Sequence, residues 1–144
     1  MDYMNSFAIS ASGMDLERLR LDVASLNIAN ANTSYAPNAA PIRPLQVVTS
    51  GLSAPTFGTL FDSQYGGGGV SGVSVEEVAD EPRLVSDPGN PHADASGFVR
   101  YPKVNMANEM ISLIKAVRGY EANIVAFNAA KVMAQKAMDL GSGR

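Results

Sequence analysis

The chain has 144 residues, of which 17% are charged, and its formal net charge is −3 at pH 7. Acidic and basic residues are mixed throughout, and no block rich in lysine or arginine predicts nucleic-acid binding. The absence of cysteine excludes disulfides, thiolate ligands and a cysteine nucleophile. The longest apolar run is far shorter than a membrane span. The residues before Arg18 lack the basic head and apolar stretch of a signal peptide, so we expect neither membrane insertion nor a cleaved signal.

Residues from about Asn5 to Ala31 are predicted to form one helix. Two series of mostly apolar residues recur there with heptad spacing, three positions apart, which is typical of a coiled-coil seam. A second apolar stripe, formed by Met14, Leu21 and Ile28, lies about 140° round the helix from the first. A helix that is apolar on two sides is usually buried on two sides. The seam series are Ile9, Leu16, Val23, Asn30 and Ser12, Leu19, Leu26, Thr33.

Asparagines gather at the end of this helix, in the stretch DVASLNIANANTSYAP. An asparagine at a seam position lowers stability but specifies register and partner. We therefore predict that the amides of Asn27 and Asn30 bond to neighbouring helices in a packed array. The alternative is that Asn30, Asn32 and Thr33 simply end the helix, because asparagine suits caps and turns.

The middle of the chain, from about Thr33 to Pro102, is rich in glycine and proline. The short runs PLQVVTS, GTLF, GVSVEEVA and RLVS, with no helix between them, predict a small antiparallel β unit. Gly66–Gly69 is interpreted as a flexible hairpin tip, because the spacing does not fit a phosphate loop. His92 is the only histidine and is interpreted as a solvated loop residue, since a metal site built from it and Asp94 would lack ligands.

The last part, from about Asn105 to Leu140, is predicted to be one long helix. Asn105 is the expected N-cap and Gly141 the residue that ends the helix. Gly119 inside the helix either permits close helix approach or occupies a neutral surface position. The predicted seam, with alternating spacings of four and three, is Met106, Met110, Leu113, Val117, Tyr120, Ile124, Phe127, Lys131, Ala134 and Met138.

Two periodic helices at opposite ends of the chain predict a mainly α fold with a small β unit. The helices would pair as an antiparallel coiled coil, with the short-stranded β insertion between them. The corresponding division is 1–33 for the N-terminal helix, 34–103 for the middle segment and 104–144 for the C-terminal helix. Apolar residues left over on the second helix, Ile111, Ile114, Val125 and Val132, would still need cover. Further copies or close relatives of the chain are the natural partners.

Both terminal segments resemble signatures of the bacterial flagellar rod and hook family. The first is SGMDLERLRLDVASLNIANANTSYAP, where an Asn-rich segment follows an amphipathic helix. The second, YPKVNMANEMISLIKAVRGYEANIVAFNAAKVMAQKAMDLG, resembles the terminal helix of that family. Together with DPGNPHADASGFVRYPKVN, these segments are most similar to a subunit of the proximal rod.

The resemblance implies a structural subunit of the flagellar basal-body rod in the periplasm, exported unfolded through the flagellar type III apparatus. Its terminal helices would pack around the export channel in a shaft that transmits torque. Implied partners are copies of itself, other rod proteins and, as further candidates, the MS ring or the hook-basal body junction protein. The seams and the matching motifs together predict a subunit interface of Leu16, Leu19, Val23, Leu26, Asn27, Asn30, Asn32, Thr33, Met110, Leu113, Ile114, Val117, Arg118, Tyr120, Glu121, Asn123, Ile124 and Phe127.

Two other interpretations remain open at this point. One is another rod or hook-type axial subunit of the flagellum. The other is a cytosolic coiled-coil adaptor, which would stay in the cell where a rod subunit would be secreted. An enzyme is the weakest option, because catalysis would need a nucleophile, a base and an orienting partner, and the serines lack a nucleophile-elbow context. No cofactor, metal site or catalytic residue is predicted.

Overall fold

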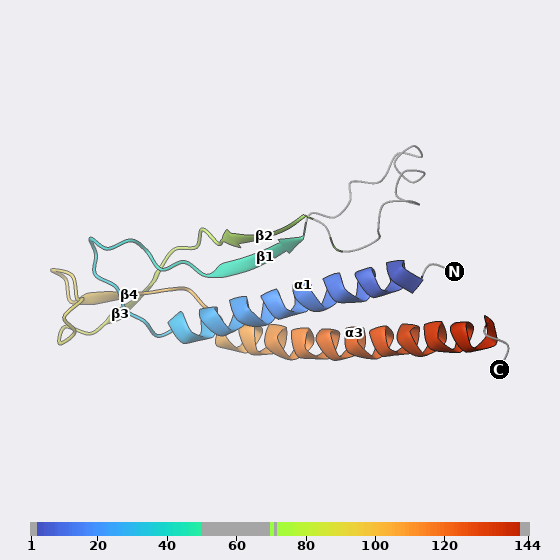
Figure 1. Cartoon of the computed structure of the whole chain (residues 1–144). Coiled ribbons are helices and arrows are strands. Elements are labelled where there is room, and N and C mark those ends of the chain that lie inside the picture. The colour runs from blue at the N-terminus through green and yellow to red at the C-terminus, as the bar shows by residue number, and fades with distance from the viewer. Residues whose placement is uncertain (1–2, 50–69, 71, 142–144) are drawn as a thin grey trace. The chain divides into compact units, whose positions relative to one another are not determined.

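The computed structural model describes residues 3–49, 70 and 72–141. The predicted strand GTLF and the glycine run Gly66–Gly69 lie outside these residues. Two long helices lie at the ends of the chain and two small sheets come between them in chain order (Figure 1). The two helices are in contact, so the predicted mainly α fold with a small β unit is confirmed. The elements are α1 Tyr3–Asn30, β1 Leu45–Thr49, β2 Val73–Glu77, β3 Arg83–Ser86, β4 Phe98–Tyr101 and α3 Met106–Gly141.

The start of α3 is set by Asn105, as predicted. Its side-chain Oδ1 accepts hydrogen bonds from the backbone N–H groups of Ala107, at 3.1 Å, and Asn108, at 3.2 Å. These bonds satisfy two of the backbone donors that the first turn of a helix leaves without intrahelical acceptors. Glu109 follows in the same turn, where the helix dipole favours a negative charge.

The end of α1 falls at Asn30. The N–H of Thr33 bonds to the carbonyl oxygen of Asn30 at 2.9 Å, which closes a turn directly after the helix. Asn32 and Thr33 are exposed and lie outside the helix. Their positions match the alternative in which these residues end the helix. Asparagine is common in such turns because its side chain can hydrogen-bond to nearby backbone groups.

The sheets have two strands each, β1 with β2 and β3 with β4. β3 and β4 run antiparallel, with Leu84 opposite Arg100 and Val85 opposite Val99. Val99 is fully buried, while Leu84, on the other face of the strand pair, is exposed. A further backbone bond, from Tyr35 N–H to the Arg100 carbonyl at 3.2 Å, attaches the segment after α1 to β4.

The loop between β3 and β4 contains His92, and its environment differs from the prediction. The side chain is half-buried, and its Nδ1 lies 2.9 Å from the Ser34 hydroxyl oxygen. The loop is ordered by its own polar residues, since Asp94 Oδ1 accepts from the N–H groups of Ser96 and Phe98. His92 is therefore a structural contact between this loop and the segment after α1, and not a solvated residue. Among the described residues, no group of three or more possible metal ligands occurs.

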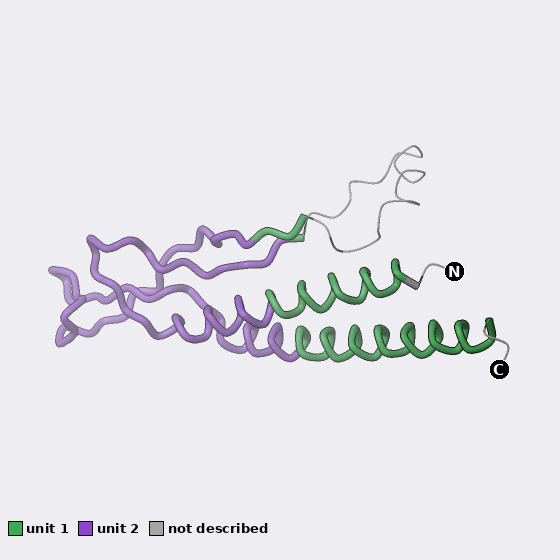
Figure 2. Tube along the Cα trace, in the orientation of Figure 1, with its two compact units in different colours: residues 1–19, 49–74, 115–144 green, residues 20–48, 75–114 purple. Residues whose placement is uncertain are grey.

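The chain divides into two compact units, each of which contains part of both helices (Figure 2). Unit 1 comprises residues 1–19, 49–74 and 115–144, and unit 2 comprises residues 20–48 and 75–114. Each unit has its own buried residues: Leu16, Ala116 and Ala130 in unit 1, and Val23, Ala24, Ala31, Tyr35 and Val99 in unit 2. The three-part division made from the sequence stays a prediction.

Candidate subunit interface

The contact between α1 and α3 in unit 1 is made at two glycines. An ideal Cβ built on Gly13 of α1 would lie only 2.8 Å from Asn123 Nδ2 of α3. Four residues further along α1, the side chain of Glu17 lies over Gly119 of α3, where a Cβ would come within 2.9 Å of Glu17 Cδ. Gly119 thus lies at the helix contact and not at a neutral surface position, and the atoms nearest to it belong to a flexible side chain.

In unit 2 the helices meet at Asn27 of α1 and Glu109 of α3, whose side chains are hydrogen-bonded. The contacting pairs are Asn27 with Glu109, Glu17 with Gly119, and Gly13 with Asn123. Each step toward the N-terminus of α1 is matched by a step of the same length toward the C-terminus of α3. Equal and opposite steps are the signature of an antiparallel pair. At the far end of unit 1, the rings of Phe7 and Phe127 pack with centroids 5.0 Å apart, which adds an aromatic contact.

The face of α3 that meets α1 consists mainly of small and polar residues. Glu109, Ala116, Asn123 and Ala130 recur with heptad spacing, and we call them the inner row. Glu109 and Asn123 contact α1, while Ala116 and Ala130 are the buried residues of α3, at 1% and 4% exposure. Small residues let two helix backbones approach closely, and the short side chains leave no gap.

As the contact between the two helices, the predicted seam was wrong in one of its two series on α3, and on α1 exposed residues occur in both series. On α3, Met110, Val117, Ile124 and Lys131 are exposed, and the inner row lies one residue earlier. On α1, Leu16 and Val23 are buried as expected, but Ile9 and Leu26 are exposed. The prediction followed the large apolar residues, whereas the contacts between the helices also include glycines, polar side chains and buried alanines.

The outward surface of α3 carries large apolar side chains that are exposed in the described part of the chain. In unit 2 these are Met110, Ile111 and Ile114, of which Ile114 is 54% exposed. In unit 1 they are Val117, Ile124, Val125 and Val132, of which Val125 is 67% exposed. We call these seven residues the outer row. Isolated exposed apolar residues are common, but a continuous series along one helix is typical of an interaction surface.

Asn27 lies apart from this surface. It is only 3% exposed. Its Oδ1 accepts from Leu45 N–H at 2.8 Å, and its Nδ2 donates to the Leu45 carbonyl at 2.8 Å and to Glu109 Oε1 at 3.3 Å. The amide that was predicted to bond to neighbouring helices in an array thus has its partners within the chain. Its role in a subunit interface stays a prediction.

The remaining predicted interface residues divide by exposure. Leu16 and Val23, like Asn27, are buried within the chain. The half-buried residues are Leu19, Asn30, Leu113, Tyr120, Asn123 and Phe127. The exposed residues, available to another molecule, are Leu26, Asn32, Thr33, Met110, Ile114, Val117, Arg118, Glu121 and Ile124.

Several packing residues were not predicted. Gly13, Ala116 and Ala130 contribute to the helix contact, and Leu45 binds Asn27. The recurrence of small residues, alanine at 116 and 130 in particular, could have indicated the inner row. No signal in the sequence connects Leu45 with Asn27, because that bond joins a side chain to a backbone distant in the chain.

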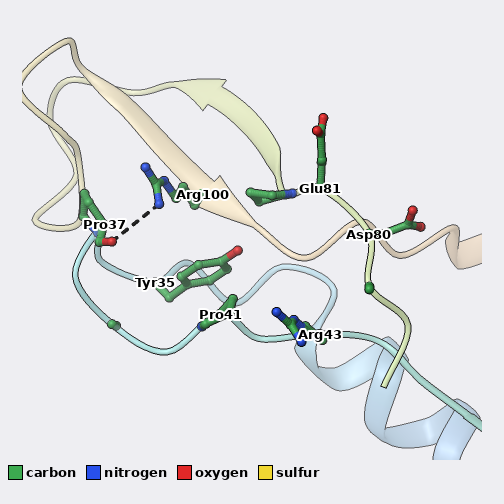
Figure 3. Close-up of a pocket in the computed structure, with 10 residues that line it drawn as sticks. Tyr35, Pro37, Pro41, Arg43, Asp80, Glu81 and Arg100 are labelled. Carbon is green, nitrogen blue, oxygen red and sulfur yellow. Dashed lines mark hydrogen bonds between the residues drawn. The ribbon is translucent and has the colours of Figure 1, made fainter. Parts of the chain in front are cut away.

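A surface groove of about 440 Å³ lies in unit 2, between the segment after α1 and the segment that joins β2 to β3 (Figure 3). Tyr35 and several prolines form much of its wall. The Arg100 guanidinium donates to the Pro37 carbonyl at 3.5 Å, and Arg43 forms an exposed ion pair with Glu77 at 3.4 Å. The charged residues that line the groove are Arg43, Asp80, Glu81 and Arg100.

None of the described helices is both long and apolar enough to span a bilayer.

The features on α3 define a class of protein: a structural protein whose paired terminal helices expose an apolar surface. Two family descriptions match the chain at these helices. Residues 7–34 match the family described as flagella basal body rod protein, and residues 95–140 match the C-terminal region described as flagellar basal body rod FlgEFG protein.

Whole-length relatives agree with these matches. The flagellar basal-body rod protein FlgC of Salmonella typhimurium is 39% identical over 141 residues, covering 98% of this chain and 99% of the relative. FlgC of Yersinia enterocolitica is 37% identical over 144 residues, and FlgC of Bacillus subtilis is 35% identical over 150 residues, with the same coverage. The chain belongs to the flagellar basal-body rod protein family. The resemblance stated from the terminal motifs is confirmed.

Proposed function

We propose that this chain is a structural subunit of the proximal rod of the bacterial flagellum, and that it assembles through the outward surfaces of its terminal helices. The observation that carries the proposal is the outer row of α3, with Ile114 and Val125 more than half exposed in the isolated chain. The similarity to FlgC over the full length supports the assignment to the rod.

Apolar burial supplies the driving force in this proposal. Removing a valine, leucine or isoleucine side chain fully from water is worth about 1.5–3 kcal/mol. Arg118 and Glu121 are also exposed on α3, but an isolated exposed ion pair contributes only about 0–1 kcal/mol. Covering the outer row would therefore stabilise an assembly far more than its charges would. The charges would then contribute to the choice of partner and to orientation.

The proposed assembly is a tube that encloses the export channel and transmits torque. Long paired helices with many lateral neighbours resist bending, which suits a drive shaft. The proposed neighbours are copies of this chain and other rod proteins, with the MS ring or the hook-basal body junction protein at the ends. The proposed location is the periplasmic part of the basal body. The proposed route is the flagellar type III apparatus, with the chain unfolded in transit.

Incorporation into basal bodies tests the proposal. We expect Ile124→Asp and Leu26→Asp, expressed in cells that lack the native protein, to be recovered in purified basal bodies at a level at least about tenfold below the native chain, because a buried charge opposes assembly. Arg118→Gln should be recovered within about twofold, since it removes only an exposed charge. Quantitative blotting of basal-body fractions against total protein gives the ratio.

The fold of each variant provides the control. Both positions changed to aspartate are exposed in the chain, so circular dichroism of the isolated variants should match that of the native protein. Equal losses for all three variants would contradict an interface based on apolar burial. Native incorporation of Ile124→Asp would exclude the outer row from the interface.

Two other assignments are separated by localisation. A hook-type axial subunit would also be found with the basal body, but deleting its gene would leave the proximal rod in place in electron micrographs. A cytosolic adaptor would be recovered only in the cytoplasmic fraction. Missing rods above an intact membrane base, in cells without this gene, are the outcome that the proposal requires.

A further inference from the structure

One side chain joins three elements of unit 2. The buried amide of Asn27, on α1, bonds to both backbone groups of Leu45, the first residue of β1, and to the Glu109 carboxylate in the first turn of α3. We propose that this amide is a latch that makes the docking of β1 onto α1 depend on the presence of α3 alongside. The inference does not rest on the proposed rod function, because it concerns contacts within a single chain.

The first half of the latch imitates a neighbouring strand. In an extended strand, the N–H and C=O of one residue point to the same side. The Asn27 amide offers one acceptor and one donor to this pair, both at 2.8 Å. The preceding residue, Pro44, has no N–H, and its carbonyl accepts from Val78 N–H at 2.8 Å. The start of β1 is thus held by the segment after β2 and by a side chain of α1.

The second half of the latch reaches α3. The same Nδ2 that bonds to Leu45 donates its other hydrogen to Glu109 Oε1. If α3 moved away, this hydrogen would lose its acceptor and Asn27 would lose the cover of α3, so water could compete for the amide and for the Leu45 backbone groups. The amide would then gain by turning toward water, and Leu45 would lose both of its bonds to the side chain. Hydrogen bonds that share a group also polarise one another, which reinforces the dependence.

Amide hydrogen exchange at Leu45, measured by NMR on the full chain, tests the latch. Asn105→Ala removes the N-cap of α3, a loss of about 1 kcal/mol in typical helices and thus about fivefold in opening. We expect the Leu45 amide to exchange about threefold to tenfold faster in this variant. The described hydrogen bonds of Asn105 all lie within the first turn of α3 and include none to β1. Asn108→Ala changes an exposed asparagine of the same turn and should leave Leu45 exchange at the native rate.

A result in which α3 loosens without β1 would overturn the proposal. If the first-turn amides of α3 exchange faster in Asn105→Ala while Leu45 keeps its native rate, β1 docks independently of α3. Faster exchange at Leu45 in Asn108→Ala, equal to that in Asn105→Ala, would also overturn it, because the effect would then not depend on the cap.

A polarity swap tests the Asn27–Glu109 bond itself. Asn27→Asp keeps the size of the side chain but removes both donors and places a carboxylate next to Glu109, so Leu45 exchange should rise by at least about tenfold. Adding Glu109→Gln supplies an amide that can donate to the new carboxylate. In the double variant, the Leu45 amide should exchange at least about threefold more slowly than in Asn27→Asp. Glu109→Gln alone is the control, because its Oε1 can still accept from Asn27. Equal exchange in Asn27→Asp and the double variant would remove α3 from the latch.

Discussion

The two faces of α3 differ in the size of their residues. The inner row contains alanines that are almost completely buried, together with Asn123 packed against a glycine. The outer row contains methionine, isoleucine and valine side chains that are 37–67% exposed. In most soluble helices the large apolar residues face the core. The comparison indicates that α3 places small residues in its inner row, toward α1, and large apolar residues in its outer row.

The difference separates two sources of stability. Close backbone approach at the inner row depends on shape, so any added atom must displace a neighbour. The outer row can stabilise only by being removed from water, so it contributes little to the stability of the isolated chain, where its side chains remain exposed. A substitution at the inner row should therefore change the folding of the monomer. A substitution at the outer row should change assembly and leave the monomer nearly unaffected.

The largest effect is expected from enlarging an inner-row residue. Ala116→Leu adds three carbon atoms where the residue is 1% exposed, and we expect it to lower the free energy of unfolding by about 1–3 kcal/mol. Ala126→Leu makes the same chemical change at an exposed position of α3 and should change it by less than about 0.5 kcal/mol. Urea denaturation followed by circular dichroism measures both. Equal effects would show that the inner row is not tightly packed.

An intermediate effect, with opposite signs, is expected at the two glycines. Alanine is favoured over glycine in a helix interior by about 1 kcal/mol. At Gly119 the new methyl meets the long side chain of Glu17, which can rotate, so Gly119→Ala should be stabilising by up to about 1 kcal/mol. At Gly13 the methyl meets the short amide of Asn123 with contacts of 2.8–3.0 Å, so Gly13→Ala should be destabilising by about 1 kcal/mol.

Asn123→Ala in the Gly13→Ala background provides the control for this pair. Removing the amide should relieve the contact and restore part of the lost stability. The same unfolding measurement applies to all three variants. Stabilisation by Gly13→Ala alone would show that the helices are further apart at this point than the structure indicates.

The smallest effect on the monomer is expected at the outer row. Val125→Gln exchanges an apolar side chain that is 67% exposed for a polar one, and the free energy of unfolding should change by less than about 0.5 kcal/mol. Its incorporation into basal bodies should fall if the outer row is an interface. A large loss of monomer stability would indicate that this face packs within the chain, which would remove the contrast between the two rows.

The sequence predicted the elements well where their signals are local. Heptad spacing and cap residues can be recognised within one helix, without its tertiary partners. Both long helices were predicted, and Asn105 was correctly predicted as the N-cap of α3. The terminal motifs also sufficed for the family, since they match it at residues 7–34 and 95–140. The short strand RLVS was predicted for the same reason, because a short β-like run between turn residues is a local signal.

The tertiary structure decided which face of each helix points inward. Heptad spacing fixes the interval between seam residues, but several rotations of the helix satisfy the same interval. The rotation is selected by how closely the partner can approach, and alanine and glycine permit an approach that valine at 117 or isoleucine at 124 would prevent. The partners of Asn27 and His92 were likewise decided by the fold, since Leu45 and Ser34 come near them only when segments distant in the chain meet.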